Sequence, residues 1–206
     1  MQIKTGGPPE AHTAGMSHIT LSVIRQEHAA LSAVLRTLTM LLAEHRRQKT
    51  LPDFHVLRTM LFYVDEFPER LHHAKESQLL FPLLRRRSEQ ARELLDRLDA
   101  DHEQGEAKIR ELEHALLGFE MMGDARRAAF ETAAERYVQF YLAHMRTEES
   151  EVLPLAECVL LPEDWVELDA AFARNRDPLT GFEPMPEYDA LFSRIVRLVP
   201  APLGLG

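Results

Sequence analysis

The sequence predicts an all-α fold, an up-down-up-down antiparallel four-helix bundle with a short helical C-terminal tail. Three observations support this fold class. Apolar residues recur at steps of three or four through four long segments, short connections join the segments, and none alternates like a β-strand. We expect residues 1–16 to be a disordered lead-in, residues 17–158 to form the bundle, and residues 159–206 to be a tail packing on it.

The first two helices are expected at about residues 17–48 and from near Pro52 to about Arg87. Proline suits the first turn of a helix, which explains the start of the second one. Pro68 and Pro82 fall inside that helix, and each removes an internal backbone hydrogen bond. We therefore expect kinks or short breaks at these two positions.

The other two bundle helices are expected at about residues 89–120 and 124–157. Gly123 lies in the turn between them, where a helix commonly ends. The tail is expected to hold two shorter helices, near residues 162–175 and 186–198, separated by a turn-rich stretch.

Composition excludes several classes of protein. The 206 residues include 45% hydrophobic ones, enough for a substantial core, and the net charge of −9 argues against nucleic acid or an anionic membrane as a partner. No run approaches the roughly 20 apolar residues of a membrane span, and the N-terminus lacks the apolar run of a signal peptide. One cysteine, Cys158, allows no intrachain disulfide. We expect a cytoplasmic protein.

One segment occurs twice. His72, Glu76 and Pro82 recur as His144, Glu148 and Pro154, with one constant offset along the chain. In a helix, residues four apart share a face, so each His–Glu pair points the same way, beside apolar core positions. A buried, unpaired carboxylate is costly, whereas a metal ion takes a neutral imidazole and an ionised carboxylate together.

The repeat extends to the other two helices. His28 and His102 occupy similar places in the first and third helices, separated by nearly the same offset. The chain therefore consists of two helical hairpins that bring four histidines and two glutamates to one level of the core. Glu106, four residues after His102, adds a further candidate ligand.

These residues, in this order, resemble the hemerythrin-like, or HHE cation-binding, family over about residues 17–157. The resemblance implies a non-haem di-iron centre with an oxo or hydroxo bridge. One iron is then bound by His28 and His72 and the other by His102, Glu106 and His144. Glu76 and Glu148 bridge both ions. The first iron keeps an open position for O2, NO or peroxide.

The sequence departs from the respiratory hemerythrins at two positions. Glu106 stands where they have histidine, and Glu148 follows His144 by four residues, where their bridging aspartate follows by five. A third carboxylate favours ferric over ferrous iron. We therefore expect a protein that is not primarily an oxygen carrier, and manganese or a mixed iron–manganese pair also suits the ligand set.

Other readings apply to individual residues. Tyr141, three residues before His144, is a candidate to donate a hydrogen bond to a bound oxygen ligand. His73 is expected at the edge of the bundle, because adjacent residues of a regular helix point about 100° apart. The Glu-x-x-His spacing of ferritin-like di-iron proteins occurs at Glu69 and Glu111, but that site explains fewer residues.

The sequence leaves two functions open, and a third possibility in which the bundle binds no metal. The first is a protein that binds, senses or stores O2, NO or iron. The second is a di-iron redox enzyme that breaks down peroxide, reduces NO or protects against iron-related stress. In the third, the bundle is purely structural and its polar residues have no metal. A homodimer is left open, with no nucleic acid and no membrane as partner.

Overall fold

The computed structural model describes residues 18–174 and 177–180, together with Ser193 and Arg197. The expected lead-in, residues 1–16, and most of the second expected tail helix, near residues 186–198, lie outside this part of the chain.

The first half of the bundle consists of two long rods. The first rod is α1 (Ile19–Gln48). The second is a continuous series of helical segments that alternates between α- and π-helix: α2 (Phe54–Val64), η1 (Asp65–His72), α3 (His73–Lys75), η2 (Glu76–Leu80) and α4 (Phe81–Arg87). Asp53 caps its start by accepting hydrogen bonds from the backbone N–H groups of His55 and Val56.

The second half repeats this plan. A short 3-10 turn, η3 (Glu89–Ala91), leads into α5 (Arg92–Met122). The fourth rod is α6 (Asp124–Thr147), the π-helical η4 (Glu148–Val152) and α7 (Leu153–Val159). Gly123 joins α5 to α6 with a φ of 60°, a left-handed conformation that glycine adopts without a steric penalty.

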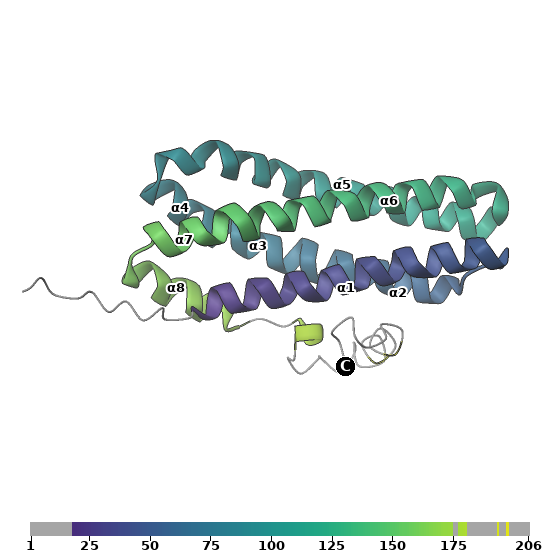
Figure 1. The fold of residues 1–206 in the computed structure, drawn as a ribbon, viewed down its shortest axis with the longest axis horizontal. Coiled ribbons are helices and arrows are strands. Elements are labelled where there is room, and N and C mark those ends of the chain that lie inside the picture. Colours follow the sequence, from purple (N-terminus) through teal and green to yellow (C-terminus); the bar gives the residue numbers. More distant parts are fainter. Residues whose placement is uncertain (1–17, 175–176, 181–192, 194–196, 198–206) are drawn as a thin grey trace, which may run out of the picture.

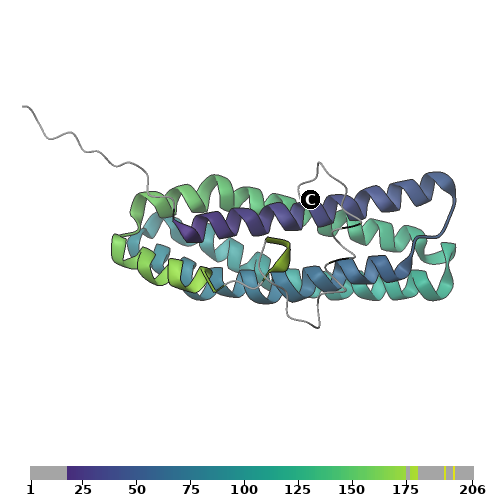
Figure 2. The ribbon, with the colours of Figure 1, turned by 90° about the horizontal axis from the view of Figure 1, so that it is seen from below.

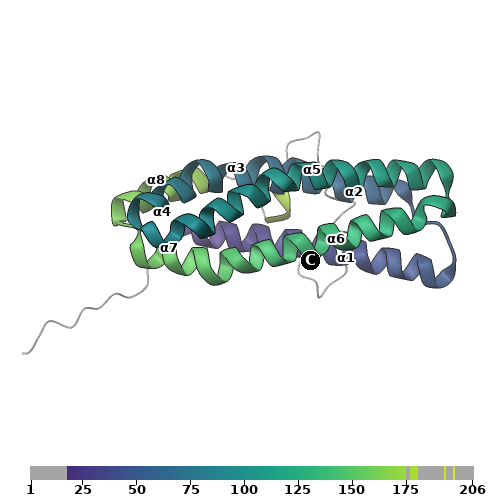
Figure 3. The same ribbon diagram turned by 90° about the horizontal axis from the view of Figure 1, so that it is seen from above.

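The four rods lie side by side along the long axis of the molecule, and each runs antiparallel to the next (Figures 1 and 3). Contacts join α1 to α2, α2 to α5, α5 to α6 and α6 back to α1, which closes the ring. No strand occurs among the described residues. The prediction of an all-α antiparallel bundle is confirmed.

The rod does not break at Pro68 and Pro82, but its α-helix gives way to π-helix beside both residues. Pro68 lies inside η1, and Pro82 is the second residue of α4, which follows η2. In a π-helix the N–H bonds to a carbonyl five residues back, so the turn is wider than in an α-helix. We attribute the continuity of the rod to these wider turns, which absorb the proline ring and the missing N–H without ending the helix.

The hydrophobic core is divided in two along the bundle. One cluster includes Leu31, Leu112 and Tyr137, and the other includes Ile24, Leu98 and Leu153. Between them lies a layer of buried polar side chains: His28, His72, Glu76, His102, His144 and Glu148. A polar layer that interrupts an apolar core costs stability unless its groups are satisfied, so it requires a functional explanation.

The helix α8 (Pro162–Phe172) folds back on the start of α1 (Figures 1 and 2). The rings of His18 and Trp165 stack with centroids 3.8 Å apart, and the Thr20 backbone N–H and hydroxyl donate to Asp169 Oδ1 at 2.9 and 2.7 Å. Asp177 lies directly before the short 3-10 turn η5 (Pro178–Thr180). It accepts a hydrogen bond from the Tyr63 hydroxyl at 2.9 Å.

In the described part of the chain, no helix has both the length and the apolar character needed to cross a membrane.

Candidate metal centre

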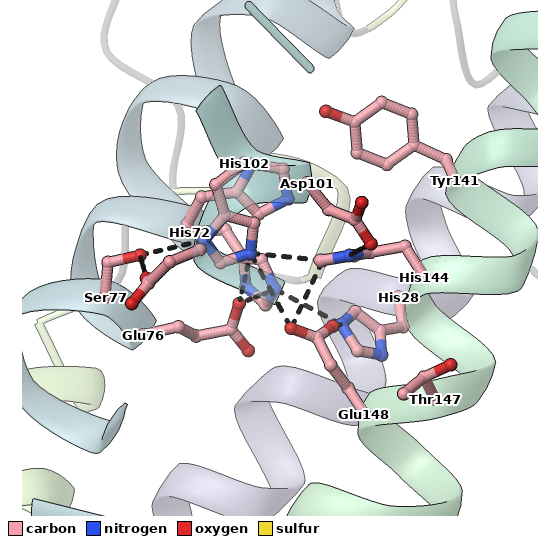
Figure 4. Close-up of polar contacts among 12 residues, drawn as sticks. His28, His72, Glu76, Ser77, Asp101, His102, Tyr141, His144, Thr147 and Glu148 are labelled. Carbon is pink, nitrogen blue, oxygen red and sulfur yellow. Dashed lines mark hydrogen bonds and ion pairs between the residues drawn. The ribbon is translucent and has the colours of Figure 1, made fainter. Parts of the chain in front are cut away.

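The polar layer is built by all four rods. His28 comes from α1, His72 and Glu76 from the second rod, His102 from α5, and His144 and Glu148 from the fourth rod. Their exposed fractions lie between 1% and 8%. Figure 4 shows the imidazoles and carboxylates pointing toward one another from opposite sides of the bundle.

The six side chains form two groups that share both carboxylates. One group is His28, His72, Glu76 and Glu148, and the other is His102, His144, Glu76 and Glu148. Within each group the candidate ligand atoms lie within 4.8 Å of one another. Two adjacent cation positions bridged by two glutamates would use every one of these side chains.

The inner imidazole nitrogens are spaced as ligands of a common ion. His28 Nε2 lies 3.2 Å from His72 Nε2, and His102 Nε2 lies 3.1 Å from His144 Nε2. Two nitrogens each about 2.1 Å from one ion, at nearly a right angle, are about 3 Å apart. The donor set therefore fits a transition-metal ion on each side.

The outer nitrogens of the same histidines are held by other side chains. His72 Nδ1 is 2.7 Å from Glu27 Oε2, His28 Nδ1 is 3.0 Å from Glu149 Oε1, and His102 Nδ1 is 2.8 Å from Ser77 Oγ. The Ser77 hydroxyl in turn donates to Asp99 Oδ1 at 2.6 Å. His144 Nδ1 lies 3.5 Å from Asp101 Oδ2. A partner that accepts from Nδ1–H leaves the Nε2 lone pair free to bind a metal.

This outer set follows the same internal repeat as the inner one. Glu27 directly precedes His28 as Asp101 precedes His102, and each of these acids orients a histidine of the following rod. Ser77 directly follows Glu76, and Glu149 directly follows Glu148. Ser77 orients His102 of α5, and Glu149 orients His28 of α1. Both hairpins therefore supply the same parts in the same order.

The burial and charge of Glu76 and Glu148 favour a bound cation in this layer. Burial, followed by repulsion from Glu148, raises the pKa of Glu76 well above its usual value. Burial also works against an ionised Glu148, but His144, His102 and His28 outweigh it and lower the pKa of that carboxyl. Glu76 Oε2 and both carboxylate oxygens of Glu148 lack a hydrogen-bond partner of good geometry. Buried oxygens of this kind are satisfied by metal ions.

The family model described as "Hemerythrin HHE cation binding domain" matches residues 19–156. The chain belongs to the hemerythrin HHE cation-binding family. No curated protein and no solved structure shows a significant match to it. The resemblance inferred from His28, His72, His102 and His144 is confirmed, and the buried His/Glu cluster makes this hemerythrin-like domain a metal-binding domain.

Glu106 is the one sequence-predicted ligand that the structure does not bring to the cluster. It is exposed, and it belongs to neither group of candidate ligands among the described residues. The buried stripe of α5 runs through His102, Gly105 and Ile109 instead. A Cβ at Gly105 would collide with the Tyr141 hydroxyl and come within 2.8 Å of Glu69 Oε2, so the space beside this turn is already filled.

Tyr141 and His73 also differ from expectation. The Tyr141 hydroxyl donates a hydrogen bond to Glu69, and in Figure 4 the ring lies apart from Glu76 and Glu148. His73, expected at the bundle edge, is only 5% exposed. That expectation assumed a regular α-helix, whereas the chain enters His73 from the π-helical η1.

A second buried carboxylate lies beside the centre. Glu69 Oε1 accepts hydrogen bonds from the hydroxyls of Tyr137, at 2.9 Å, and Tyr141. Burial raises the pKa of Glu69 to about 7, even though both tyrosines act in the opposite direction. Glu69 is thus a carboxyl whose charge can change near neutral pH.

A cavity of about 590 Å³ reaches this region from the surface. Its lining includes Glu69, His73 and His102 on the inside and Glu103 and Glu106 toward solvent. The cavity is large enough for a small ligand and comes into direct contact with one histidine of the cluster.

The structure does not support the ferritin-like alternative, because the second Glu-x-x-His pair does not point into the bundle. Glu69 is buried and engaged by tyrosines, but Glu111 and His114 are exposed on α5, away from the polar layer. A ferritin-like centre needs its Glu-x-x-His pairs to project inward from the bundle helices. The Glu111–His114 pair does not.

Sequence analysis missed the five residues that support the centre from outside: Glu27, Glu69, Ser77, Asp101 and Glu149. Four of them gave a usable signal, because each is adjacent in sequence to a candidate ligand on its own helix. What the sequence does not reveal is that each of these four contacts a histidine of a different rod.

We predict that Glu27→Gln weakens metal binding by about 10–100-fold, the usual effect of losing a carboxylate behind a ligating histidine. The amide can still accept from His72 Nδ1–H, but it carries no charge to raise the basicity of the ring. Competition with a chromophoric chelator measures the change. Glu103→Gln, on the exposed face of α5, is the matched control and is expected to bind metal like the wild type. Equal affinities of the two variants would contradict the role given to Glu27.

Proposed function

We propose that this hemerythrin-like domain is a non-haem di-iron protein that binds or senses O2, NO or iron at a carboxylate-bridged centre in its core. The observation that carries the proposal is the pair of two-histidine groups that share Glu76 and Glu148. Imidazole suits iron, and carboxylates suit iron and manganese, so a manganese or mixed iron–manganese centre is the variant to test beside it.

Each side chain has a defined part in this proposal. His28 and His72 hold one ion, His102 and His144 hold the other, and Glu76 and Glu148 neutralise charge between them. The ions supply the redox-active orbitals at which a diatomic ligand or peroxide binds. The surrounding apolar clusters keep bulk water away from the centre, which strengthens electrostatic interactions within it.

The placement of Glu106 changes the argument about oxygen carriage. A third carboxylate ligand would have favoured the ferric state, but Glu106 is exposed and lines the outer cavity. With two carboxylates in the centre, that objection to reversible O2 binding no longer applies. We therefore retain O2 among the candidate ligands, with NO and peroxide, and propose the cavity of Glu106 and His73 as their route inward.

The deciding experiment is the ultraviolet–visible spectrum of anaerobically iron-loaded protein, before air, after air and after evacuation. Bands that appear in air and disappear on evacuation support a reversible carrier or sensor. Bands that appear and persist support an oxidising centre. Iron analysis of the same sample finds two ions per chain if the proposal is correct. A protein that takes up neither iron nor manganese would overturn it.

A di-iron redox enzyme is the second candidate, and Glu69 is the observation that favours it. This carboxyl, with a pKa near 7, lies behind His73 at the inner end of the cavity and is held by two tyrosine hydroxyls. A group of this kind can hold or release a proton during peroxide or NO chemistry. Catalysed peroxide loss that falls in Glu69→Gln, with iron content unchanged, would favour the enzyme over the sensor.

Metal binding is predicted to become tighter as the pH rises. Burial lowers the pKa of His28, but the neighbouring carboxylates of Glu148 and Glu149 outweigh it and raise the value from 6.5 to about 9 in the metal-free protein. Since an ion needs the neutral ring, binding releases this proton. Apparent affinity should therefore rise about tenfold per pH unit below pH 9, with at least one proton released per chain, as measured with an indicator dye.

The same proton gives the metal-free protein the opposite pH dependence. The folded protein holds it more tightly than the unfolded chain, in which histidine titrates near 6.5. The stabilisation is complete below pH 6.5 and is lost as the pH rises toward 9. Metal affinity that is flat across this range would contradict the protonation assigned to His28.

Two broader proposals complete this function. The single cysteine, Cys158, which is exposed, fits a reducing cytoplasmic setting. The expected packing of the tail on the bundle also stays a proposal, which among the described residues is supported by the hydrogen bond from the Tyr63 hydroxyl to Asp177. A homodimer stays a prediction for measurements in solution.

A further inference from the structure

We infer that His73 is a fifth imidazole ligand of the centre, on the side of His102 and His144. The inference rests on the proposed di-metal function and makes the two halves of the centre unequal. It also replaces Glu106, which sequence analysis placed on that ion.

The local helix geometry brings His73 inward. In a regular α-helix adjacent residues point about 100° apart, so the sequence pattern alone places one of His72 and His73 beside the core-facing stripe. Here η1 (Asp65–His72) is π-helical, and a second π-segment begins at Glu76. The two neighbouring histidines are 3% and 5% exposed. Single π-turns inside α-helices occur frequently at functional sites.

His73 lies against the ligands of one ion. It belongs with His102 and His144 to a third group of candidate ligands, whose atoms lie within 4.8 Å of one another. Its ring stacks on His102 with centroids 4.1 Å apart and meets His144 edge-on at 5.5 Å.

The ion on this side is short of ligands without His73. His102 and His144 supply two nitrogens, and Glu76 and Glu148 supply bridging oxygens. Iron and manganese commonly take more than four ligands. Glu106, one turn beyond His102, is exposed and does not supply the next one. His73 is the further histidine that groups with His102 and His144 among the described residues.

Glu69 gives His73 the outer partner that the four other histidines have. Glu69 Oε2 lies 3.2 Å from His73 Nδ1, and Tyr137 and Tyr141 fix the carboxylate through its other oxygen. A carboxylate behind a ligating imidazole sets its orientation and raises its basicity. His28 and His72 have no such extra histidine within their group, so the open position falls on their ion.

The rival explanation is structural, with His73 serving only as a buried partner of Glu69. His73→Phe keeps a ring that can stack on His102 but removes the lone pairs. His114→Phe is the matched control, because it makes the same exchange at an exposed histidine of α5 and leaves the polar layer unchanged. Iron content and chelator competition are measured on both variants, with circular dichroism to establish that each is folded.

We expect the wild type and His114→Phe to bind two ions with similar affinities. His73→Phe is expected to keep one tight ion and to lose at least about 100-fold in affinity for the other, which is the upper end of the range for residues that only support a ligand. Two ions bound equally well by His73→Phe and His114→Phe would overturn the inference. A wild type that binds no metal would instead overturn the proposed function itself.

A measurement on the unaltered protein covers the case in which His73→Phe does not fold. Pulsed electron paramagnetic resonance of the mixed-valence wild type, with ¹⁵N-labelled histidine, counts the imidazole nitrogens on the two ions. Five nitrogens, divided three and two, support His73 as a ligand. Four nitrogens, divided equally, overturn it.

Discussion

Replacing Glu148 by glutamine is expected to empty both metal positions. Glu148 belongs to both ligand groups, and its carboxylate oxygens lie 3.2 Å from His28 Nε2, 3.2 Å from His144 Nε2 and 3.7 Å from His102 Nε2. Glutamine has the same shape but no charge, so both ions lose a shared anionic ligand at once. We expect the affinity to fall by more than the roughly 100-fold seen when supporting residues are lost.

Metal analysis after gel filtration checks this, with Glu151→Gln as the matched control. Glu151 is in the same π-helical segment, one turn away, but is exposed. The control is expected to retain two ions per chain, whereas Glu148→Gln retains fewer than one. If Glu148→Gln held as much metal as the control, the bridging role would be wrong and the two positions would be independent sites.

The clustering of the six candidate ligands could be predicted because two kinds of regularity coincide in them. His72 and Glu76 share a helix face whether the turn is α or slightly wider, and the internal repeat places His144 and Glu148 at the same depth. A repeated hairpin turns a weak local pattern into a specific one, since an isolated buried histidine has many structural explanations.

Glu106 and His73 could not be placed by the same reasoning, and the causes are local. The assignment of Glu106 assumed that the position four residues after His102 has room to reach the ion. Glu106 instead lines the outer cavity, and the buried residue of this turn is Gly105, whose bare backbone packs against Glu69 and Tyr141. The assignment of His73 assumed about 100° per residue, which the π-helical η1 does not obey. Neither cause is visible in helical periodicity.

The prolines explain why the π-segments occur where they do. Pro82 and Pro154 occupy the same place in the two copies of the repeat, and each stands at the start of an α-segment that follows a π-segment. Each of these two π-segments opens on a glutamate that both groups of candidate ligands share, Glu76 or Glu148. The wider turn thus accommodates the proline and positions the shared carboxylate, which links the repeated sequence feature to the candidate metal centre.

Metal loading is expected to raise the melting temperature by about 15–30 °C. An ion present at 1,000 times its dissociation constant stabilises the folded state by about 4 kcal/mol. Two ions give about 8 kcal/mol, and a chain of this size gains about 2–4 °C per kcal/mol. Differential scanning fluorimetry with and without metal measures the shift, and a chelator should reverse it. His114→Ala, an exposed histidine on α5, should show the full shift.

The variant His144→Leu distinguishes a polar layer that binds metal from one that is purely structural. In the metal-free protein two effects oppose each other in this variant. Removing a buried imidazole favours folding, but Glu148 loses a partner that keeps it ionised. We therefore expect metal-free His144→Leu to melt within about 5 °C of the metal-free wild type, a difference on the order of 1–2 kcal/mol. With metal, the wild type gains the full shift, and His144→Leu gains at most about half of it, because the group of His28 and His72 keeps its ligands. If metal moved neither protein, the layer would be a structural device, and the buried charges of Glu76 and Glu148 would have to be compensated by protons alone.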